Sequence, residues 1–163
     1  MQTLTVKDIM TASPVMTKPT QTIKEAASIM KENDCGVLPV GTPTKVLGML
    51  TDRDIAIRLV AEGKDALKTQ VQDIMSKQVF MCEEGDSLET AAEHMRKHDV
   101  SRLIVCDANM ATGIVTLACL LRNKGDRRKS DKVLHELLGR KTPQKKQTVE
   151  MATAGAGCES CDA

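Results

Sequence analysis

The hydrophobic positions of this chain recur after an interval of 65 residues. Residues 6–51 align without a gap with residues 71–116, and 13 of the 46 aligned positions are identical. The interval is easiest to see in VKDIM at 6–10 and VQDIM at 71–75. Most of the identical positions are apolar or small, which indicates one supersecondary unit used twice.

Each copy predicts the same order of elements. A short apolar stretch (15–16 and 79–81) precedes a helix whose apolar residues recur at helical spacing. In the first copy Thr22 is followed three residues later by Glu25, which is a capping box and marks the helix start. Two strands joined by a turn sequence come next, and a second helix follows. The strands are expected at 37–40, 46–50, 102–105 and 112–115, and the second helices at 52–61 and 117–123.

The repeated unit is therefore β-α-β-β-α. A three-stranded sheet with helices on one face is too thin to bury that face alone, so we expect a pseudo-twofold pair in an α/β (α+β) fold. Residues 1–65 are assigned to the first repeat. Residues 66–140 are assigned to the second repeat, which ends in a short helix from Ser130 to Gly139. Residues 141–163 have no apolar period and are expected to form a flexible tail.

The composition excludes several partners. The chain has 23 Lys and Arg residues and 22 Asp and Glu residues. Its net charge of +1 therefore provides no electrostatic attraction to nucleic acid or to an anionic membrane. Phe80 is the single Phe, Tyr or Trp of the chain, so a planar ligand is expected to lie between aliphatic side chains. The chain lacks a membrane-spanning run and a secretory signal, and we expect it in the cytoplasm.

The cysteines and histidines suggest no metal site. The six cysteines follow no disulfide rhythm and are expected to be mostly small core residues in a reducing compartment. CESC at 158–161 lacks the β-α-β setting of a redox motif, so a redox or metal role is the less favoured hypothesis. His94, His98 and His135 have no ligand-type partner at metal-binding spacing and are expected on solvated helix faces.

TDRD at 51–54 is the candidate chemical site, because it lies at a strand-to-helix turn. Free backbone N–H groups at the helix start would suit a phosphate, and Arg53 could neutralise its charge. Asp54 is an acceptor-only carboxylate that suits the paired hydroxyls of a ribose. Alternatively, Thr51 and Asp54 form only a capping box. The second copy keeps Thr116 but continues with LAC, so the fold tolerates loss of the acid. This favours a ligand role for Asp54 beside any role as a cap.

Three motifs together resemble a known family. DIM at the entrance of each unit, GVLPV on the second strand and GMLTDRDI at the turn are similar to the cystathionine β-synthase (CBS) domain. Two in tandem resemble a Bateman module, and the resemblance covers about residues 1–140. It implies a cleft-bearing pair that binds adenosyl compounds as regulatory signals, with phosphate on the Thr and ribose on the Asp of the turn. It also implies a homodimer, because such pairs commonly bury their helices against a second pair.

The resemblance further implies two unequal clefts. The first would contain Gly36, Val37, Met49, Thr51, Arg53 and Asp54, with Asp86, Ala91 and Val100 opposite. The second would contain Ser101, Arg102, Ile114 and Thr116, with Gln21, Ala26 and Cys35 opposite. The second cleft lacks a ribose acid, so weak or no nucleoside binding is expected there. Arg102 would bind phosphate, or is only a surface strand residue. Asp86 departs from the pattern, because its carboxylate would repel a phosphate unless it is turned away as a helix cap.

These observations predict a stand-alone, non-catalytic sensor. An adenine nucleotide (AMP, ADP or ATP) would bind as a regulatory ligand and alter an unidentified effector protein or the oligomer, and no cofactor is required. One alternative is a structural interaction module with vestigial clefts. Another is a binder of S-adenosylmethionine or NAD(H). An enzyme is not expected, because the sequence shows no nucleophile with a paired base and no acid pair at useful spacing.

Overall fold

The computed structural model describes residues 4–122. In the first repeat the elements are α1 (Val6–Ile9), β1 (Thr11–Ala12), α2 (Ile23–Glu32), β2 (Val37–Thr42), β3 (Lys45–Thr51), α3 (Asp52–Ile55) and the π-helical η1 (Ala56–Val60). In the second they are α4 (Val71–Ile74), β4 (Met81–Glu83), α5 (Leu88–Lys97), β5 (Arg102–Asp107), β6 (Met110–Thr116) and α6 (Leu117–Arg122). The predicted helix at 130–139, the tail, His135 and CESC lie outside the described residues.

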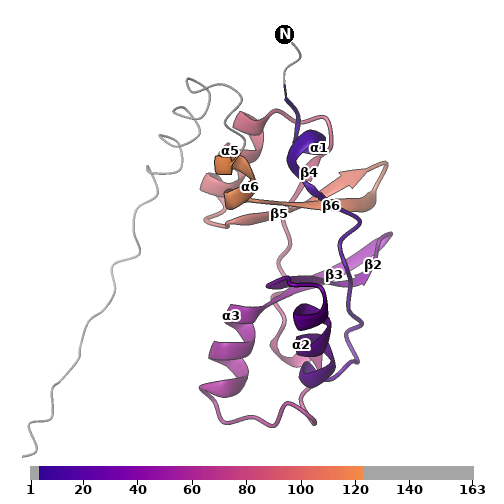
Figure 1. The fold of residues 1–163 in the computed structure, drawn as a ribbon, viewed down its shortest axis with the longest axis vertical. Helices are drawn as coiled ribbons and strands as arrows, with labels where there is room; N and C mark the ends of the chain where they lie inside the picture. The colour runs from indigo at the N-terminus through magenta and orange to yellow at the C-terminus, as the bar shows by residue number, and fades with distance from the viewer. Residues whose placement is uncertain (1–3, 123–163) are drawn as a thin grey trace, which may run out of the picture.

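The two repeats stack through their sheets, with the helices on the outer faces (Figure 1). In the first repeat β2 and β3 pair antiparallel, and in the second the strand order is β1-β6-β5-β4 with β4 parallel to β5. Apolar side chains of both sheets, among them Ile104, Ile114 and Val46, form a cluster of their own. The predicted α+β fold of two stacked repeats is confirmed, because each sheet buries its helix-free face against the other.

The predicted helix starts are also confirmed. At the start of α2, Glu25 accepts a hydrogen bond of 2.7 Å from the backbone N–H of Thr22, and the Thr22 hydroxyl accepts one of 3.3 Å from the N–H of Glu25. The helix predicted at 52–61 is a continuous run of α3 and η1. The local sequence therefore suffices to place these ends.

The first predicted strand of the first repeat is wrong: it is reduced to a single bridge between Thr17 and Val40. In the second repeat the N–H of Ile104 donates to the carbonyl of Phe80 at 3.0 Å, and this bond extends the parallel ladder. Pro39 stands at the position equivalent to Ile104 and has no N–H. The ladder of the first repeat therefore stops one step earlier.

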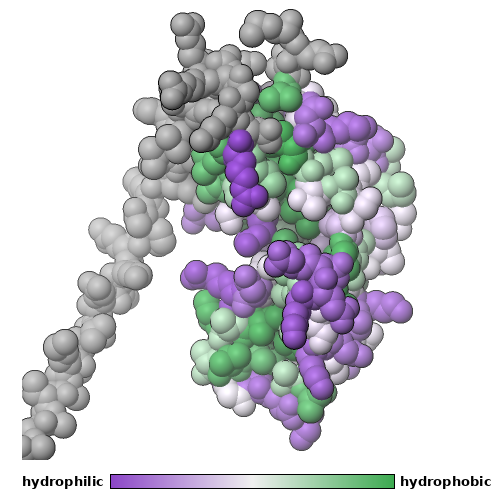
Figure 2. All heavy atoms as spheres, viewed as in Figure 1, coloured by the Kyte–Doolittle hydropathy of each residue, from purple (hydrophilic) through white to green (hydrophobic). Residues whose placement is uncertain are grey.

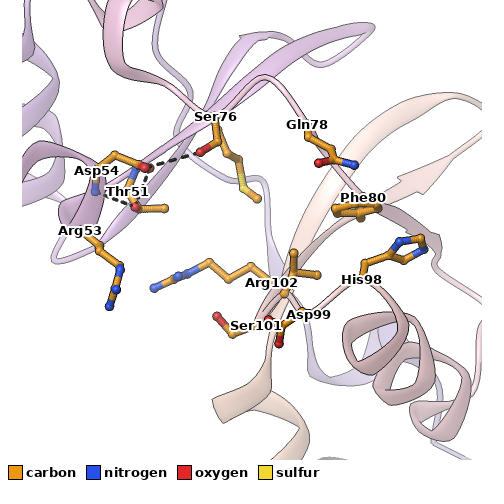
Figure 3. Close-up of a pocket in the computed structure, with 12 residues that line it drawn as sticks. Thr51, Arg53, Asp54, Ser76, Gln78, Phe80, His98, Asp99, Ser101 and Arg102 are labelled. Atoms are coloured by element: carbon orange, nitrogen blue, oxygen red, sulfur yellow. Dashed lines mark hydrogen bonds between the residues drawn. The ribbon is translucent and has the colours of Figure 1, made fainter. Parts of the chain in front are cut away.

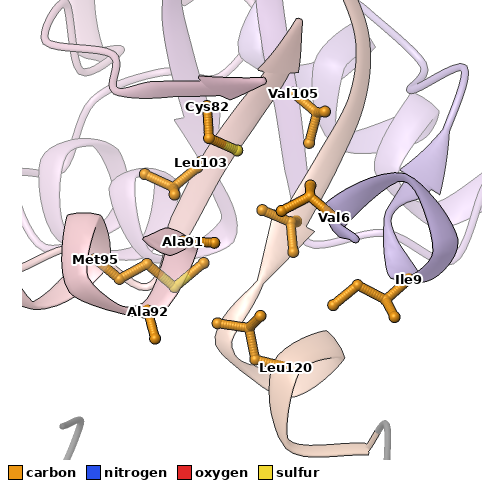
Figure 4. Packing of buried hydrophobic residues seen from close by; sticks show 10 residues of the cluster. Val6, Ile9, Cys82, Ala91, Ala92, Met95, Leu103, Val105 and Leu120 are labelled. Carbon is orange, nitrogen blue, oxygen red and sulfur yellow. The ribbon is translucent and has the colours of Figure 1, made fainter. Parts of the chain in front are cut away.

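The repeated pentapeptide forms a short helix that packs in the opposite repeat. Val6 and Ile9 of α1 lie in the core of the second repeat, where they face residues such as Leu120 and Leu103 (Figure 4). Val71 and Ile74 of α4 lie in the core of the first repeat. Each hydrophobic core thus takes one helix from the other half of the sequence. Burial of these apolar side chains ties the two repeats into one folding unit.

The segment that follows each short helix pairs with the sheet of the opposite repeat, and we call it the crossing segment. Thr11 pairs with Ile114 on β6, and at the equivalent place Ser76 pairs with Met49 on β3. The second segment is close enough that a Cβ added at Gly48 would lie 2.7 Å from the carbonyl oxygen of Ser76. The glycine shared by both repeats is therefore required for close approach of the crossing segment.

Replacing Gly48 by Ala is expected to lower the free energy of unfolding by about 1–3 kcal/mol, because the crossing segment must move to admit a methyl group. Urea denaturation followed by circular dichroism measures this. Gly85→Ala is the matched control: no atom lies within 4 Å of its added Cβ, and a change below about 0.5 kcal/mol is expected. Equal stability of the two variants would show that the crossing segment is not tightly seated.

Candidate functional site

A cleft of about 410 Å³ lies between the two repeats. Both repeats supply its walls: β3 and α3 on one side, and the segment before β4, the end of α5 and the start of β5 on the other (Figure 3). The lining residues are Met49, Thr51, Arg53, Asp54, Ser76, Gln78, Phe80, His98, Asp99, Val100, Ser101 and Arg102. The cleft thus combines apolar and polar side chains and holds charges of both signs.

Five residues predicted for the first cleft line it: Met49, Thr51, Arg53, Asp54 and Val100. Ser101 and Arg102, which were assigned to the second cleft, line this same cleft. The start of β5 lies opposite the end of β3, where the TDRD turn begins. One cleft therefore collects the polar groups that the sequence divided between two.

The other predicted site residues do not line this cleft. Ala91 is fully buried in the core of the second repeat, and Val37 packs against the cluster between the sheets. The carbonyl of Gly36 accepts a hydrogen bond of 3.1 Å from the N–H of Asp52. Thr116 caps α6 by accepting a hydrogen bond of 3.2 Å from the N–H of Cys119, as its sequence predicts.

Asp86 is turned away from the cleft. Its carboxylate accepts a hydrogen bond of 2.9 Å from the backbone N–H of Glu83, and its carbonyl accepts one of 2.9 Å from Val6 of the crossing helix. The cap of α5 is Ser87 instead. The carboxylate that departed from the family pattern thus closes a turn, and it does not add repulsion to an anion in the cleft.

The backbone N–H groups at the start of α3 are already bonded. The N–H of Asp52 donates to Gly36, that of Arg53 to the Asp52 carboxylate at 2.7 Å, and that of Asp54 to the Thr51 hydroxyl at 3.1 Å. The expectation of free N–H groups for a phosphate was therefore wrong. An anion here would be bound by side chains such as those of the two arginines.

The Asp54 carboxylate presents two different oxygens. Oδ2 accepts short hydrogen bonds from the Thr51 hydroxyl (2.7 Å) and the Thr51 N–H (3.0 Å), so the capping box is present. Oδ1 lies 3.5 Å from the Ser76 hydroxyl and 3.5 Å from Nη1 of Arg58. These contacts are long for hydrogen bonds, which leaves Oδ1 with accepting capacity toward a ligand. The cap and an additional bonding role are compatible in one side chain.

Two arginines reach into the cleft from opposite repeats. Figure 3 shows the Arg102 side chain extending from β5 toward Arg53 of α3. Across residues 4–122, no ion pair involves either guanidinium. Two cations that converge without a bonded carboxylate favour an anionic ligand, since guanidinium groups bind phosphate and carboxylate in a fork.

Phe80 and His98 form an aromatic wall that sequence analysis missed. Their rings stack with centroids 4.0 Å apart and planes 23° apart, and both line the cleft. The expectation of purely aliphatic walls was therefore wrong. His98 is exposed, as predicted, but it is the C-cap residue of α5 and lines the cleft. Its position directly before the entrance of the second strand was the signal that could have indicated this.

Equivalent positions of the two repeats, which are 65 residues apart, carry different side chains around the cleft. At six cleft positions the equivalent residue, 65 positions away in the other repeat, is apolar or smaller. The pairs are Arg53/Ala118, Asp54/Cys119, Ser101/Gly36, Arg102/Val37, Phe80/Val15 and His98/Asn33. The fold keeps its shape with either set, so the groups gathered in this cleft are not needed for folding.

The four described cysteines form no disulfide with one another. Cys82 and Cys106 are buried as predicted, and Cys35 and Cys119 are half-buried. Burial, with a smaller contribution from Asp86, raises the pKa of the Cys82 thiol to about 12. Within the described part of the chain, no group of three or more His, Cys, Asp or Glu side chains could hold a metal ion, and no helix is long and apolar enough to cross a membrane.

Two α/β repeats stacked through their sheets, with a cleft at the junction, define a tandem two-domain module. The chain belongs to the CBS domain family, whose model matches residues 6–61 and 71–125. It is 43% identical over 119 residues to the CBS domain-containing protein YhcV of Bacillus subtilis (strain 168), which covers 73% of this chain and 84% of that protein. The family assigned by resemblance is thus confirmed.

Further relatives agree. Hypoxic response protein 1 of Mycobacterium tuberculosis (strain ATCC 25618 / H37Rv) is 32% identical over 120 residues, 73% of this chain and 84% of that protein. A crystal structure of Hypoxic Response Protein I with two coordinated zinc ions superposes with a TM-score of 0.64 at 32% identity, covering 74% of this chain and 98% of that one. An uncharacterized conserved protein from Pyrococcus horikoshii gives a TM-score of 0.69 at 26% identity, with 78% and 97% covered.

Proposed function

We propose that this protein is a non-catalytic sensor that binds an adenine nucleotide in the cleft between its two CBS repeats. The observation that supports the proposal most is the convergence of Asp54, Arg53 and Arg102 in one cleft. A carboxylate oxygen with accepting capacity suits ribose hydroxyls, and two guanidinium groups suit phosphates. Occupancy would change how the repeats pack, because both contribute walls.

The two arginines of the cleft favour a phosphate-bearing ligand over S-adenosylmethionine. S-adenosylmethionine has a sulfonium cation, which the two arginines would disfavour. AMP, ADP and ATP place their negative charge where the arginines converge, and the Phe80 and His98 rings offer a stacking surface for a purine. ADP or ATP would use both guanidinium groups more fully than AMP.

Calorimetric titration of the full chain tests this proposal. AMP, ADP, ATP, S-adenosylmethionine and NAD are the ligands, and adenosine reports the nucleoside part alone. We expect binding of the nucleotides, with affinity rising with the number of phosphates. A flat response to the entire panel would favour the second candidate, an interaction module with vestigial clefts.

We also propose that the output passes through a homodimer. Ile57 and Val60 on η1 and Leu121 on α6 are exposed at 50%, 67% and 38% of their surfaces. The helices η1 and α6 lie on the same side of the described chain (Figure 1). Figure 2 shows apolar surface in the lower repeat, over the α3 and η1 helix. Large exposed apolar side chains that gather on one side mark interaction surfaces.

Val60→Glu is expected to convert a dimer to a monomer in sedimentation velocity at micromolar concentration, because it places a charge in the apolar contact. Leu67→Glu is the control, since Leu67 is 61% exposed but lies on the connector between the repeats. A wild-type monomer, or equal loss of association in both variants, would rule out this surface.

A further inference from the structure

We infer that Arg58 is a positioning residue of the cleft: it orients the Asp54 carboxylate toward the ribose without touching the ligand. This inference rests on the proposed function and names a residue outside the cleft lining. Arg58 lies in the π-helical segment η1, one turn after Asp54. Single π-helical turns are frequent at functional sites, because the extra residue redirects the side chains that follow.

The guanidinium of Arg58 joins two parts of the structure. Its Nη1 donates a hydrogen bond of 2.7 Å to the carbonyl of Ile74 and lies 3.5 Å from Oδ1 of Asp54. Ile74 ends α4, and its side chain is 1% exposed in the first-repeat core. The guanidinium is therefore anchored on a fixed carbonyl at the end of α4.

The anchoring matters because Thr51 holds only one end of the carboxylate. Both short hydrogen bonds from Thr51 reach Oδ2, so this residue alone does not set the plane of the group. Arg58 and Ser76 approach Oδ1, at 3.5 Å each, and define its direction. The Asp54 side chain is 12% exposed, so little water is available to replace these partners.

Arg58 acts from behind Asp54. It is not among the cleft-lining residues, whereas Asp54 is. Two vicinal hydroxyls of a ribose require a carboxylate held in one orientation, since each hydrogen bond weakens steeply when its angle departs from linear. Loss of Arg58 should therefore lower the preference for ribose more than it lowers binding of the rest of the nucleotide.

The test compares ADP with 2′,3′-dideoxy-ADP, which lacks both hydroxyls. In the wild-type full chain we expect ADP to bind at least about tenfold more tightly by calorimetry. In Arg58→Met this preference should fall roughly threefold or more, with the affinity for the dideoxy compound changed less than about twofold. Arg58→Lys keeps a cation beside Asp54 and should retain part of the preference. Lys68→Met is the control, because it removes an exposed cation from the connector, and Lys68 does not line the cleft.

Each outcome decides the matter. An undiminished preference in Arg58→Met overturns the inference and leaves the proposed function intact. An equal loss for both ligands also overturns it, because a merely structural role would weaken binding without regard to the hydroxyls. No binding of either ligand to the wild type overturns the proposed function and the inference with it. If urea denaturation shows that Arg58→Met does not fold, the same comparison in Arg58→Lys decides.

Discussion

Replacing Asp54 by Asn is expected to weaken adenine-nucleotide binding by roughly ten- to a hundredfold, the range of a lost charge-assisted hydrogen bond. The amide oxygen of Asn can still accept from Thr51, as Oδ2 of Asp54 does at 2.7 and 3.0 Å. Its NH2 group then replaces Oδ1 and cannot accept from ribose hydroxyls. Calorimetry with ADP measures the affinity, and urea denaturation measures the free energy of unfolding.

Asp8→Asn is the matched control for this variant. Oδ2 of Asp8 accepts hydrogen bonds from the N–H (2.8 Å) and hydroxyl (2.9 Å) of Thr5, which is the same capping box at a distance from the cleft. The exchange should change stability by a similar amount and leave ADP affinity unaltered. A loss of folding in Asp54→Asn, or equal affinities in the two variants, would show that Asp54 acts only as a cap.

Replacing Arg102 by Val should weaken ADP binding by about ten- to a hundredfold while changing adenosine binding less than about twofold. Valine occupies the twin position, residue 37, on the equivalent strand, so the strand itself accommodates it. The lost guanidinium would have bound phosphate. ADP and adenosine titrations at low and high salt measure the effect, since the salt dependence should also become shallower.

Lys97→Met is the control for this second variant. Lys97 ends α5 in the same repeat, is exposed and does not line the cleft, so its loss changes the net charge equally. ADP affinity should then change only through the long-range field, which salt screens. A parallel loss of ADP and adenosine affinity in Arg102→Val would place Arg102 against the nucleoside and contradict a phosphate contact.

Together these variants separate the parts of the proposed site. Asp54 is assigned to the ribose, Arg102 to the phosphates and Arg58 to the orientation of Asp54. The single substitutions at Asp54 and Arg58 should not be additive, because both act on the same carboxylate. Substitutions at Asp54 and Arg102 should be close to additive, since they bind different groups of the ligand.

Sequence patterns were sufficient for most features that depend on neighbouring residues, although the short helices α1 and α4 were not predicted. The 65-residue interval, the helix starts at Thr22 and Thr51 and the order of the strands follow from local periodicity and capping chemistry. The missing strand at the start of the first repeat was within reach as well, because Pro39 has no N–H. Asp54 was identified as a candidate ligand residue because the gap-free alignment places Cys119 at the equivalent position, so the fold does not require the acid.

The contacts between distant segments required the three-dimensional structure. No local pattern predicts that Val6 packs in the second repeat. Nor does one predict that Arg102 faces Arg53 of the first repeat, and not the strand-to-helix turn of its own repeat. The stacking of Phe80 on His98 and the anchoring of Arg58 on Ile74 likewise join residues from different elements. Side-chain periodicity specifies which face of an element is buried, but not which partner covers it. The packing of the two sheets against each other determines these partners. It also brings residues of both repeats together in one cleft.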